Sequence, residues 1–415
     1  MSTPNQALDR TESHADLTSP EEMLERLLAF KPVPAPVLSL YLDGRADQHG
    51  RQNFLPFARK QLTERGKTYP INSLERESFE SDFVRIARYL EDGARSSAQG
   101  IAIFACSAAD DYFEVGQFDA AFERNRLFVY DRPHLYPLAR LIDRYRRYAV
   151  VLADRNRARI FVFASGQTVG RERIDGVKTK HAKVGGWSQA RYQRHEENYH
   201  LHHAKEVVEA LERTIREEGI EHIILAGDQE TVIPILRDQM PRALSDKIIS
   251  VLSLGIDTTE HELIEESLKA FRTHESVSDS EKIERFLNEY RADDLAVAGV
   301  ADTLAALSNG QVEEMLIAAK PTSLQCDQAE VEKVLQIYGA DEDLLKTVSP
   351  RTIADELVRR ANQLSSAQVT FIEDSTRLDK VGGVGAILRY RISDNSAAPY
   401  EQSGVVSRSE AMVKT

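Results

Sequence analysis

The sequence predicts an α/β protein built from three successive α/β units. At about 150 residues per domain, a chain of 415 residues is long enough for two or three domains, and we expect three. Short apolar runs typical of buried strands alternate along the chain with longer stretches of helical periodicity. Hydrophobic residues make up 42% of the chain and charged residues 29%, which allows several buried cores and excludes global disorder.

Composition also restricts the compartment. The longest apolar runs, Ile101–Ala105 and Ile248–Leu254, are far shorter than the roughly 20 residues of a membrane helix. Met1–Pro20 is polar and acidic, without the basic start and apolar stretch of a signal peptide. Cys106 and Cys326 are too few and too far apart for a disulfide framework or a zinc site of four cysteines. We therefore expect a cytoplasmic protein that does not contact membranes.

The net charge limits how the protein can bind nucleic acid. The net charge is −13, from 53 Lys and Arg against 66 Asp and Glu. A field of this sign repels nucleic acid at long range, so any contact with RNA must come from a local basic patch.

The first predicted domain covers residues 19–147, after a disordered tail at 1–18 that is polar and has no apolar period. Ser19 is placed to cap a helix over Pro20–Phe30, which the prolines of Lys31–Pro36 end. The other elements expected in this domain are helices at Gln52–Arg65, Leu74–Ala94 and Leu135–Tyr145, and strands at Val37–Leu42, Ile101–Ala105 and Leu127–Tyr130.

The second predicted domain covers residues 148–277. Its β-rich runs are Ala149–Ala153, Ile160–Phe163, Ile223–Ala226 and Ile248–Leu254. Between the second and third of these lie a polar, basic stretch, Arg171–Val184, and one long helix, Gln189–Glu218, which Gly219 ends. Apolar residues recur on this helix at steps of three and four, along the seam Leu201, Ala204, Val208, Leu211 and Ile215.

The third predicted domain covers residues 278–392 and is entered through a charged connecting helix at Ser276–Tyr290. Its expected elements are strands at Leu295–Val300, Met315–Ala318, Val369–Ile372 and Ala386–Ile392, and a helix at Asp302–Leu307. Residues 393–415 lose all periodicity and are expected to form a second disordered tail.

The most unusual stretch is Lys178–Lys205, which carries six Lys and Arg residues but only two acidic ones. It also holds five of the eleven histidines and the only tryptophan, Trp187. Such a concentration of basic residues can neutralise several phosphates. Gly185 and Gly186 leave the backbone bare, so a ligand can approach it closely and meet its N–H groups. The alternative interpretation of the same composition is a solvated helix start with a flexible hairpin.

Three catalytic or ligand-binding motifs are matched only in part. Gly186–Ala190 loosely matches a G-x-S-x-G nucleophile elbow, but no buried strand precedes it, and Ser188 is better read as a helix cap. Gly383–Gly385 lacks the third glycine of a dinucleotide-binding loop. The histidines of the long helix do not have H-E-x-x-H spacing, so we expect no metal site; they are His195, His200, His202 and His203.

The chain resembles the archaeal and eukaryotic class I release factor superfamily, in its bacterial branch, over nearly all of Val37–Ile392. The family motif is a basic run, then Gly-Gly-Gln-Ser, then Arg-[Phe/Tyr]-x-Arg at the start of a long helix. Here the three parts are Lys178–Lys183, Gly185–Ser188 and Arg191–Arg194. Further matches, in the family order, are Leu38–Leu42, Leu127–Leu141, Val297–Leu307 and Val381–Tyr390.

The resemblance implies three domains in a tRNA-mimic arrangement. The first reaches the decoding centre of the ribosomal A site, and the middle one directs its glycine loop at the peptidyl-transferase centre. The third has the fold of kink-turn-binding ribosomal proteins and contacts a translational GTPase. The resemblance therefore implies the 70S ribosome as a partner, with elongation factor Tu or another translational GTPase as a further candidate. No cofactor is implied.

Two departures from the family bear on mechanism. Trp187 stands where hydrolytic members have Gln, and its indole offers one donor and no strong acceptor. Gln189 reaches the same space only if the loop is rebuilt, although the backbone N–H at position 187 remains available to a developing oxyanion. The first domain lacks the Asn-Ile-Lys-Ser loop used with stop codons; the corresponding turn is Gly66–Ser73, so we expect no codon-specific termination.

The sequence therefore leaves three hypotheses. The leading one is a factor that occupies the A site of idle or stalled ribosomes, as the Balon-like hibernation factors of this superfamily do. The second is a peptidyl-tRNA hydrolase acting in rescue or termination, and the third is an RNA- or protein-binding module off the ribosome. The candidate loop-tip residues, with doubtful catalytic activity, are Gly185, Gly186, Trp187 and Gln189. The candidate RNA-binding residues are Lys178, Lys180, His181, Lys183, Arg191 and Arg194.

Overall fold

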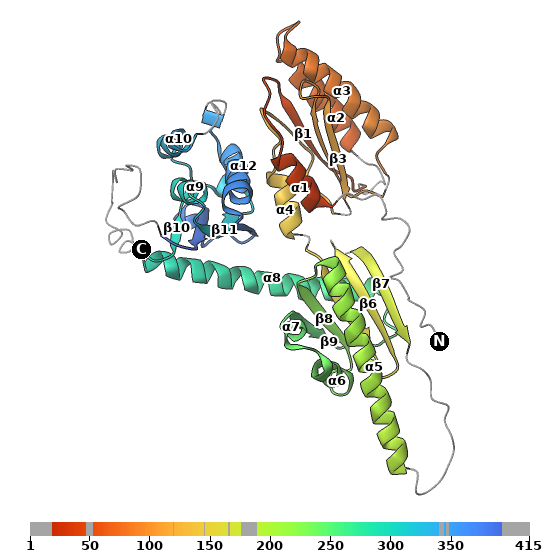
Figure 1. Ribbon diagram of the computed structural model, residues 1–415. Coiled ribbons are helices and arrows are strands. Elements are labelled where there is room, and N and C mark those ends of the chain that lie inside the picture. Colours follow the sequence, from red (N-terminus) through yellow and green to blue (C-terminus); the bar gives the residue numbers. More distant parts are fainter. Residues whose placement is uncertain are drawn as a thin grey trace.

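The computed structural model describes most of the chain. Described are residues 19–391, apart from 47–52, 96, 119, 145, 165–166, 176–188, 340–343 and 346–347. The tails predicted at 1–18 and 393–415 lie outside this range. The described residues form three separate sheets, each covered by its own helices (Figure 1). We call the three units the N-terminal, middle and C-terminal domains. Within the described residues, no helix has the length and apolar character needed to cross a membrane.

The N-terminal domain is an antiparallel sheet with strand order β3-β2-β1-β4. Its strands are β1 (Val37–Asp43), β2 (Gly100–Cys106), β3 (Tyr112–Phe118) and β4 (Arg126–Tyr130). Its helices are α1 (Pro20–Leu28), α2 (Phe54–Gly66), α3 (Leu74–Asp92) and α4 (Tyr136–Arg144). The predicted cap is confirmed, because the Ser19 side chain accepts from the N–H of Glu22. Strand β3 is absent from the predicted elements because half-buried polar residues, Glu114 and Gln117, interrupt its apolar pattern.

Period-two alternation along β1 explains why helices cover both faces of this sheet. Leu38, Leu40 and Leu42 pack with α2 and α3 on one face. Tyr41 points to the other face, where it packs with α1 and α4. The edge strand β4 is paired with β1 from Val37 to Tyr41.

The middle domain has a mixed sheet of order β7-β6-β5-β8-β9, in which β5, β8 and β9 are parallel. Its strands are β5 (Tyr148–Ala153), β6 (Arg157–Ala164), β7 (Gln167–Asp175), β8 (His222–Gly227) and β9 (Ile248–Leu252). Its helices are α5 (Gln189–Glu218), α6 (Val232–Gln239) and α7 (Arg242–Ser245). The predicted bounds of the long helix are confirmed. The polar stretch predicted from Arg171 begins inside β7, an edge strand on which Arg171 and Arg173 are exposed while Glu172 between them is buried.

One long helix joins the middle and C-terminal domains. Helix α8 (Glu260–Arg291) includes the connecting helix expected at Ser276–Tyr290 and begins much earlier. Leu263 and Phe271 pack on the face of the middle sheet opposite α5. Ile283, Phe286 and Leu287 pack on the sheet of the C-terminal domain. A Cβ at Gly385 would lie 2.2 Å from the Phe286 ring, so glycine lets this helix approach the sheet.

The C-terminal domain has the strand order β10-β13-β11-β12, with only β11 and β12 parallel among the described pairs. Its strands are β10 (Ala296–Ala298), β11 (Val312–Ala318), β12 (Gln368–Ile372) and β13 (Val384–Leu388). Its helices are α9 (Val300–Ser308), η1 (Pro321–Ser323), α10 (Gln328–Ile337), α12 (Pro350–Arg360), η2 (Ala361–Ser365) and η3 (Asp379–Val381). The strand predicted at Leu295–Val300 is shorter because Gly299, at φ +86, starts the turn into α9.

The largest apolar core of the molecule is shared by two domains. Leu135 and Leu138 of the N-terminal domain lie in the same buried cluster as Ile353 and Leu357 of α12. The middle domain has two clusters of its own, one on each face of its sheet. The N-terminal and C-terminal domains therefore share one core, although the middle domain lies between them in the sequence.

Candidate ribosome-directed surface

The elements on either side of the predicted glycine loop are β7 and α5. Strand β7 ends at Asp175, and α5 begins at Gln189. Several predicted site residues between them lie outside the described residues: Lys178, Lys180, His181, Lys183, Gly185, Gly186 and Trp187. Gln189, Arg191 and Arg194 are in the first turns of α5, and their side chains also lie outside the description. The structure therefore shows where α5 begins, whereas the contacts of the loop-tip residues remain predictions.

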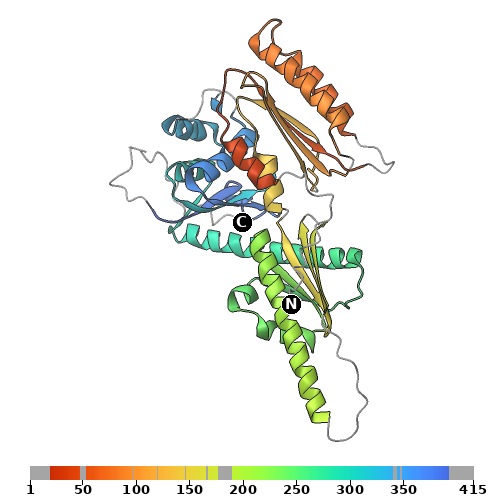
Figure 2. The ribbon, with the colours of Figure 1, turned by 45° about the vertical axis from the view of Figure 1, so that its right-hand side comes forward.

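Helix α5 carries its N-terminal end far from the rest of the molecule. In both views this end extends past the middle sheet and away from the N-terminal and C-terminal domains (Figures 1 and 2). The buried face of α5 starts at His203 and Ala204 and continues through Val207, Leu211 and Ile215. Leu201, predicted as part of the buried seam, is 38% exposed, because the sheet no longer covers the helix there. At 1.5 Å per residue, the part before His203 is about 20 Å long.

Polar contacts fix the other end of α5 to β7. The Arg213 guanidinium donates to the carboxylate of Glu172, whose side chain is 7% exposed. Thr214, which is fully buried, places its hydroxyl 3.5 Å from the same carboxylate. This pair, in which Glu172 is buried and the Arg213 side chain is about half exposed, fixes the orientation of the helix on the strand. Sequence reasoning missed Glu172 because the charged residues around it hide the alternating pattern of β7.

Two arginines of the neighbouring strands are paired with acidic side chains. Arg171 of β7 lies 2.7 Å from Glu260 at the start of α8. Arg157 of β6 lies 3.3 Å from both Asp154 and Asp257. In the sequence, the segment Lys178–Arg194 carries basic residues with no acidic residue before Glu196.

Two of the histidines considered for a metal site anchor α5 instead. His200 Nδ1 lies 2.9 Å from the carbonyl oxygen of Arg155, in the β5–β6 turn. His203 is 4% exposed, and burial lowers the pKa of its imidazole, which favours the neutral form. His202 is exposed and lies 3.5 Å from Glu206. The side chain of His195 lies outside the description. Among the described residues, no three His, Cys, Asp or Glu side chains are grouped to hold a metal ion.

The turn between α2 and α3 forms the opposite extremity of the molecule. It lies at the top of Figure 1, whereas the start of α5 lies at the bottom. Asn72 adopts φ +64, the Ser73 side chain accepts from the N–H of Arg76 at 3.2 Å, and Ile71 is 78% exposed at the tip. The turn predicted to correspond to the codon-reading loop is thus a structured, projecting tip.

Carboxyl groups with strongly raised pKa values lie away from the start of α5. Burial raises the pKa of Asp82 to about 6 inside the N-terminal domain. Burial and the neighbouring carboxylates Asp143 and Glu275 raise the pKa of Asp279 to about 6 on α8. Neither is near the end of α5 that bears Gln189.

Comparisons with known proteins agree with the order of the motifs. Residues 133–272 match the family described as bacterial archaeo-eukaryotic release factor family 10. Residues 276–392 match the family described as eRF1 domain 3. The two matches adjoin almost without a gap and cover the middle and C-terminal domains.

Similar proteins come from archaea. The peptide chain release factor subunit 1 of Methanobrevibacter smithii is 26% identical over 286 residues, which is 62% of this chain and 69% of that protein. Its counterpart from Methanocaldococcus jannaschii is 25% identical over 297 residues, with the same coverage of both proteins. Among solved structures, archaeal Pelota in a ribosome-bound model is 13% identical, with a TM-score of 0.40 over 90% of this chain and 95% of that one.

The family matches confirm what the basic segment, the glycine pair and the flanking motifs predict. This chain belongs to the archaeo-eukaryotic release factor superfamily, in its bacterial branch.

Proposed function

We propose that this release factor-like protein binds the 70S ribosome and occupies the A site of idle or stalled particles. Its role is then hibernation or rescue, with the glycine loop directed at the peptidyl-transferase centre. Lys178, Lys180, His181, Lys183, Arg191 and Arg194 contact rRNA in this proposal. The turn at Gly66–Ser73 faces the decoding centre, and elongation factor Tu or another translational GTPase is the proposed carrier.

One observation carries the proposal. The segment with surplus basic charge directly precedes and opens α5 in the sequence, and the start of α5 forms an extremity of a protein whose net charge is −13. Local positive charge at a projecting end suits entry into an RNA-walled cavity, where phosphates are close on all sides. The projecting α2–α3 turn at the opposite end supports a molecule that spans two distant parts of the A site.

The replacement of the family's Gln by Trp187 favours occupancy of the A site over hydrolysis of peptidyl-tRNA. The Trp187 indole offers a flat face for stacking on a base and lacks the carbonyl oxygen with which a Gln side chain can orient water. The second candidate, a peptidyl-tRNA hydrolase, is favoured by the retained pair Gly185-Gly186. It would use the backbone N–H of Trp187, or Gln189, as the group that stabilises the oxyanion or orients water.

Binding is tested by co-sedimentation with 70S ribosomes at physiological salt. The variant Lys178→Glu/Lys180→Glu/Lys183→Glu should bind more weakly, and the slope of log affinity against log salt should fall by about 3 because three phosphate contacts are lost. A matched control reverses the same number of exposed charges elsewhere, at Lys269, Lys320 and Lys380, and should bind like the wild type. Wild-type protein that remains in the supernatant contradicts ribosome binding.

A release assay on ribosomes carrying labelled peptidyl-tRNA separates the two candidates. Occupancy predicts no release above background for the wild type, and weaker binding for Trp187→Ala. Peptide release that Gly186→Val abolishes would assign the protein to the hydrolases instead. Crosslinking that recovers mainly RNAs other than rRNA would favour the third hypothesis, a module acting off the ribosome.

A further inference from the structure

One edge of the N-terminal sheet is open to a further strand. Strand β4 pairs with β1 on one side, and β3 forms the opposite edge of the sheet. Among the described residues, the main chain of β4 bonds to β1 alone, so the N–H and C=O groups on its outer side have no partner there. An open edge of this kind is a template for pairing with another chain.

The open edge borders a groove of about 670 Å³, which we call the β4 groove. The whole strand, Arg126–Tyr130, lines it, together with Phe57 and Gln61 of α2 and Arg351 at the start of α12. A second cavity, of about 470 Å³, shares the last two residues of β4 with it, so the open space continues past the end of the strand. At 3.3–3.4 Å per residue, β4 offers an edge about 17 Å long.

The β4 groove carries an excess of positive charge. Its charged lining consists of four arginines and one carboxylate: Arg65, Arg124, Arg126, Arg351 and Glu64. None of the four arginines forms an ion pair with another described residue. Burial and the neighbouring Arg124 and Arg351 lower the pKa of Arg126, because they disfavour a further positive charge there. Glu123 acts in the opposite direction, but it is bonded to Arg140 at 2.7 Å.

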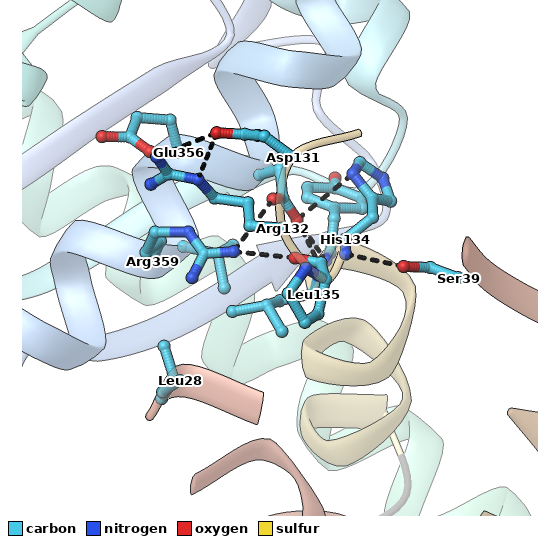
Figure 3. A network of polar contacts seen from close by, with 12 residues as sticks. Leu28, Ser39, Asp131, Arg132, His134, Leu135, Glu356 and Arg359 are labelled. Atoms are coloured by element: carbon cyan, nitrogen blue, oxygen red, sulfur yellow. Dashed lines mark hydrogen bonds and ion pairs between the residues drawn. The ribbon is translucent and has the colours of Figure 1, made fainter. Parts of the chain in front are cut away.

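Charged groups beyond the other end of β4 are engaged within the protein. Asp355 of α12 accepts from the N–H of Leu135 at 2.5 Å and from that of Tyr136 at 2.9 Å. Arg359, one turn later, donates to the carbonyl oxygen of Pro133 at 2.7 Å. Figure 3 shows Arg359 directed at the turn that carries Leu135. These charges join the N-terminal and C-terminal domains, whereas the arginines of the β4 groove make no such contact among the described residues.

An extended acidic peptide fits this groove better than the other occupants considered. A second copy of the chain, paired edge to edge, would bring the same arginines together, and their repulsion opposes self-pairing. A nucleic acid matches the arginines, but its phosphates are acceptors only and leave the outward carbonyl groups of β4 without donors. An extended peptide offers both N–H and C=O groups to the edge, and its carboxylates form charge-assisted bonds with arginine.

We propose that the β4 groove binds an extended acidic segment of another protein, which adds to the sheet as a strand beside β4. The carboxylates of this segment pair with the unpaired arginines, chiefly with Arg124 and Arg126 at the start of the strand. The inference goes beyond the proposed function, because the site lies away from the glycine loop and its binding requires no ribosome.

Selection from a displayed library of random short peptides on the full-length protein tests the proposal. The selected peptides should be rich in Asp and Glu and free of internal Pro. Measured by fluorescence anisotropy, their affinity should fall at least about 10-fold in Arg124→Glu/Arg126→Glu, because attraction becomes repulsion. The matched control Arg88→Glu/Arg216→Glu reverses two exposed arginines elsewhere and should bind like the wild type.

Hydrogen exchange separates strand addition from attraction between charges alone. Bound peptide should slow exchange of the β4 amides and leave that of the β3 amides unchanged. Alternate N–H groups of a strand point to the same side, so N-methylation of one alternate set should weaken binding at least about 10-fold, and of the other set much less. Both methylated peptides keep every carboxylate, so equal affinities would contradict strand addition.

Arg124→Ala/Arg351→Ala keeps the test decisive if the charge reversal does not fold. Both side chains are exposed, and their loss should weaken peptide binding with the fold intact. A selection without binders, or peptides that bind this variant as tightly as the wild type, overturns the proposal. An oligouridylate that binds more tightly than every selected peptide, and loses affinity in the same variants, assigns the groove to RNA instead.

Discussion

Asp82 shows how the N-terminal domain uses a buried carboxyl group. It lies on α3 with no exposed surface, and its two oxygens accept from the N–H of Ser107 at 3.1 Å and the hydroxyl of Ser107 at 2.5 Å. Burial raises its pKa to about 6, although the bonds from Ser107 and the nearby Arg85 act in the opposite direction. The carboxylate holds the turn after β2 against α3.

This residue makes stability depend on pH in a defined direction. In the unfolded chain an Asp titrates at about 3.9, so between about pH 4 and pH 6 the folded protein holds a proton that the unfolded chain has lost. The contribution of Asp82 to stability therefore falls as the pH rises through this window. Asp82→Asn keeps an acceptor for Ser107 and does not titrate, so its stability should fall less between pH 4.5 and pH 7, as measured by urea midpoints.

Asp228→Asn serves as the comparison for this prediction. Asp228 is exposed, and backbone N–H bonds lower its pKa, so its contribution to stability is lost at acid pH instead. Removing its charge should not reduce the fall between pH 4.5 and pH 7. If the stability of the wild type and of Asp82→Asn depended equally on pH, the pKa of the Asp82 carboxyl would not be raised in the folded protein.

At the scale of elements, the end of α5 depends on one glycine. Gly219 adopts φ +63 and turns the chain so that the N–H of Ile220 donates to the carbonyl oxygen of Ile215 at 3.1 Å. A Cβ at this position would meet no atom within 4 Å, so a side chain is disfavoured by backbone conformation alone.

Gly219→Ala should therefore destabilise the middle domain by about 1–2 kcal/mol, as measured by urea unfolding. Gly255 provides a matched control, because a Cβ there also meets no atom within 4 Å and its φ is not positive. Gly255→Ala should change the free energy of unfolding by less than about 1 kcal/mol and is expected to stabilise slightly. Equal effects of the two variants would contradict the conformational explanation.

At the scale of the whole molecule, two junctions should respond differently to salt: the contact of the middle domain through Arg147 and Glu218, and the buried contact between the N-terminal and C-terminal domains around Asp355. The contact of the middle domain through Arg147 and Glu218 is partly exposed, and the Debye length falls from about 10 Å at 0.1 M salt to about 3 Å at 1 M. The junction around Asp355 is buried and is screened much less.

Raising the salt concentration from 0.1 M to 1 M should thus broaden the distribution of distances between labels at positions 84 and 229, and leave that between 84 and 337 unchanged. The labels are attached at Val84→Cys, Gln229→Cys and Ile337→Cys, in a Cys326→Ser background in which Cys106 is buried. A change confined to the pair at 84 and 337 would contradict this prediction.

The sequence by itself determined the α/β class, the long helix and the family. The seam from Ala204 to Ile215 has the period of a buried helix face, and the strands Val37–Leu42 and Ala149–Ala153 are apolar enough to be read directly. These features depend on local pattern, which a single sequence records. Strands β3 and β7 were not predicted, because these edge strands carry polar side chains that interrupt the apolar pattern.

Only the tertiary structure decided how the domains are joined. Asp355 and Arg359 look like ordinary charged residues of an amphipathic helix, and their partners at Pro133, Leu135 and Tyr136 are backbone groups, which leave no trace in side-chain composition. The junction between the N-terminal and C-terminal domains depends on contacts between residues more than 200 positions apart in the sequence. Local periodicity carries no information about such contacts, because it is set by neighbours along the chain and the junction is set by neighbours in space.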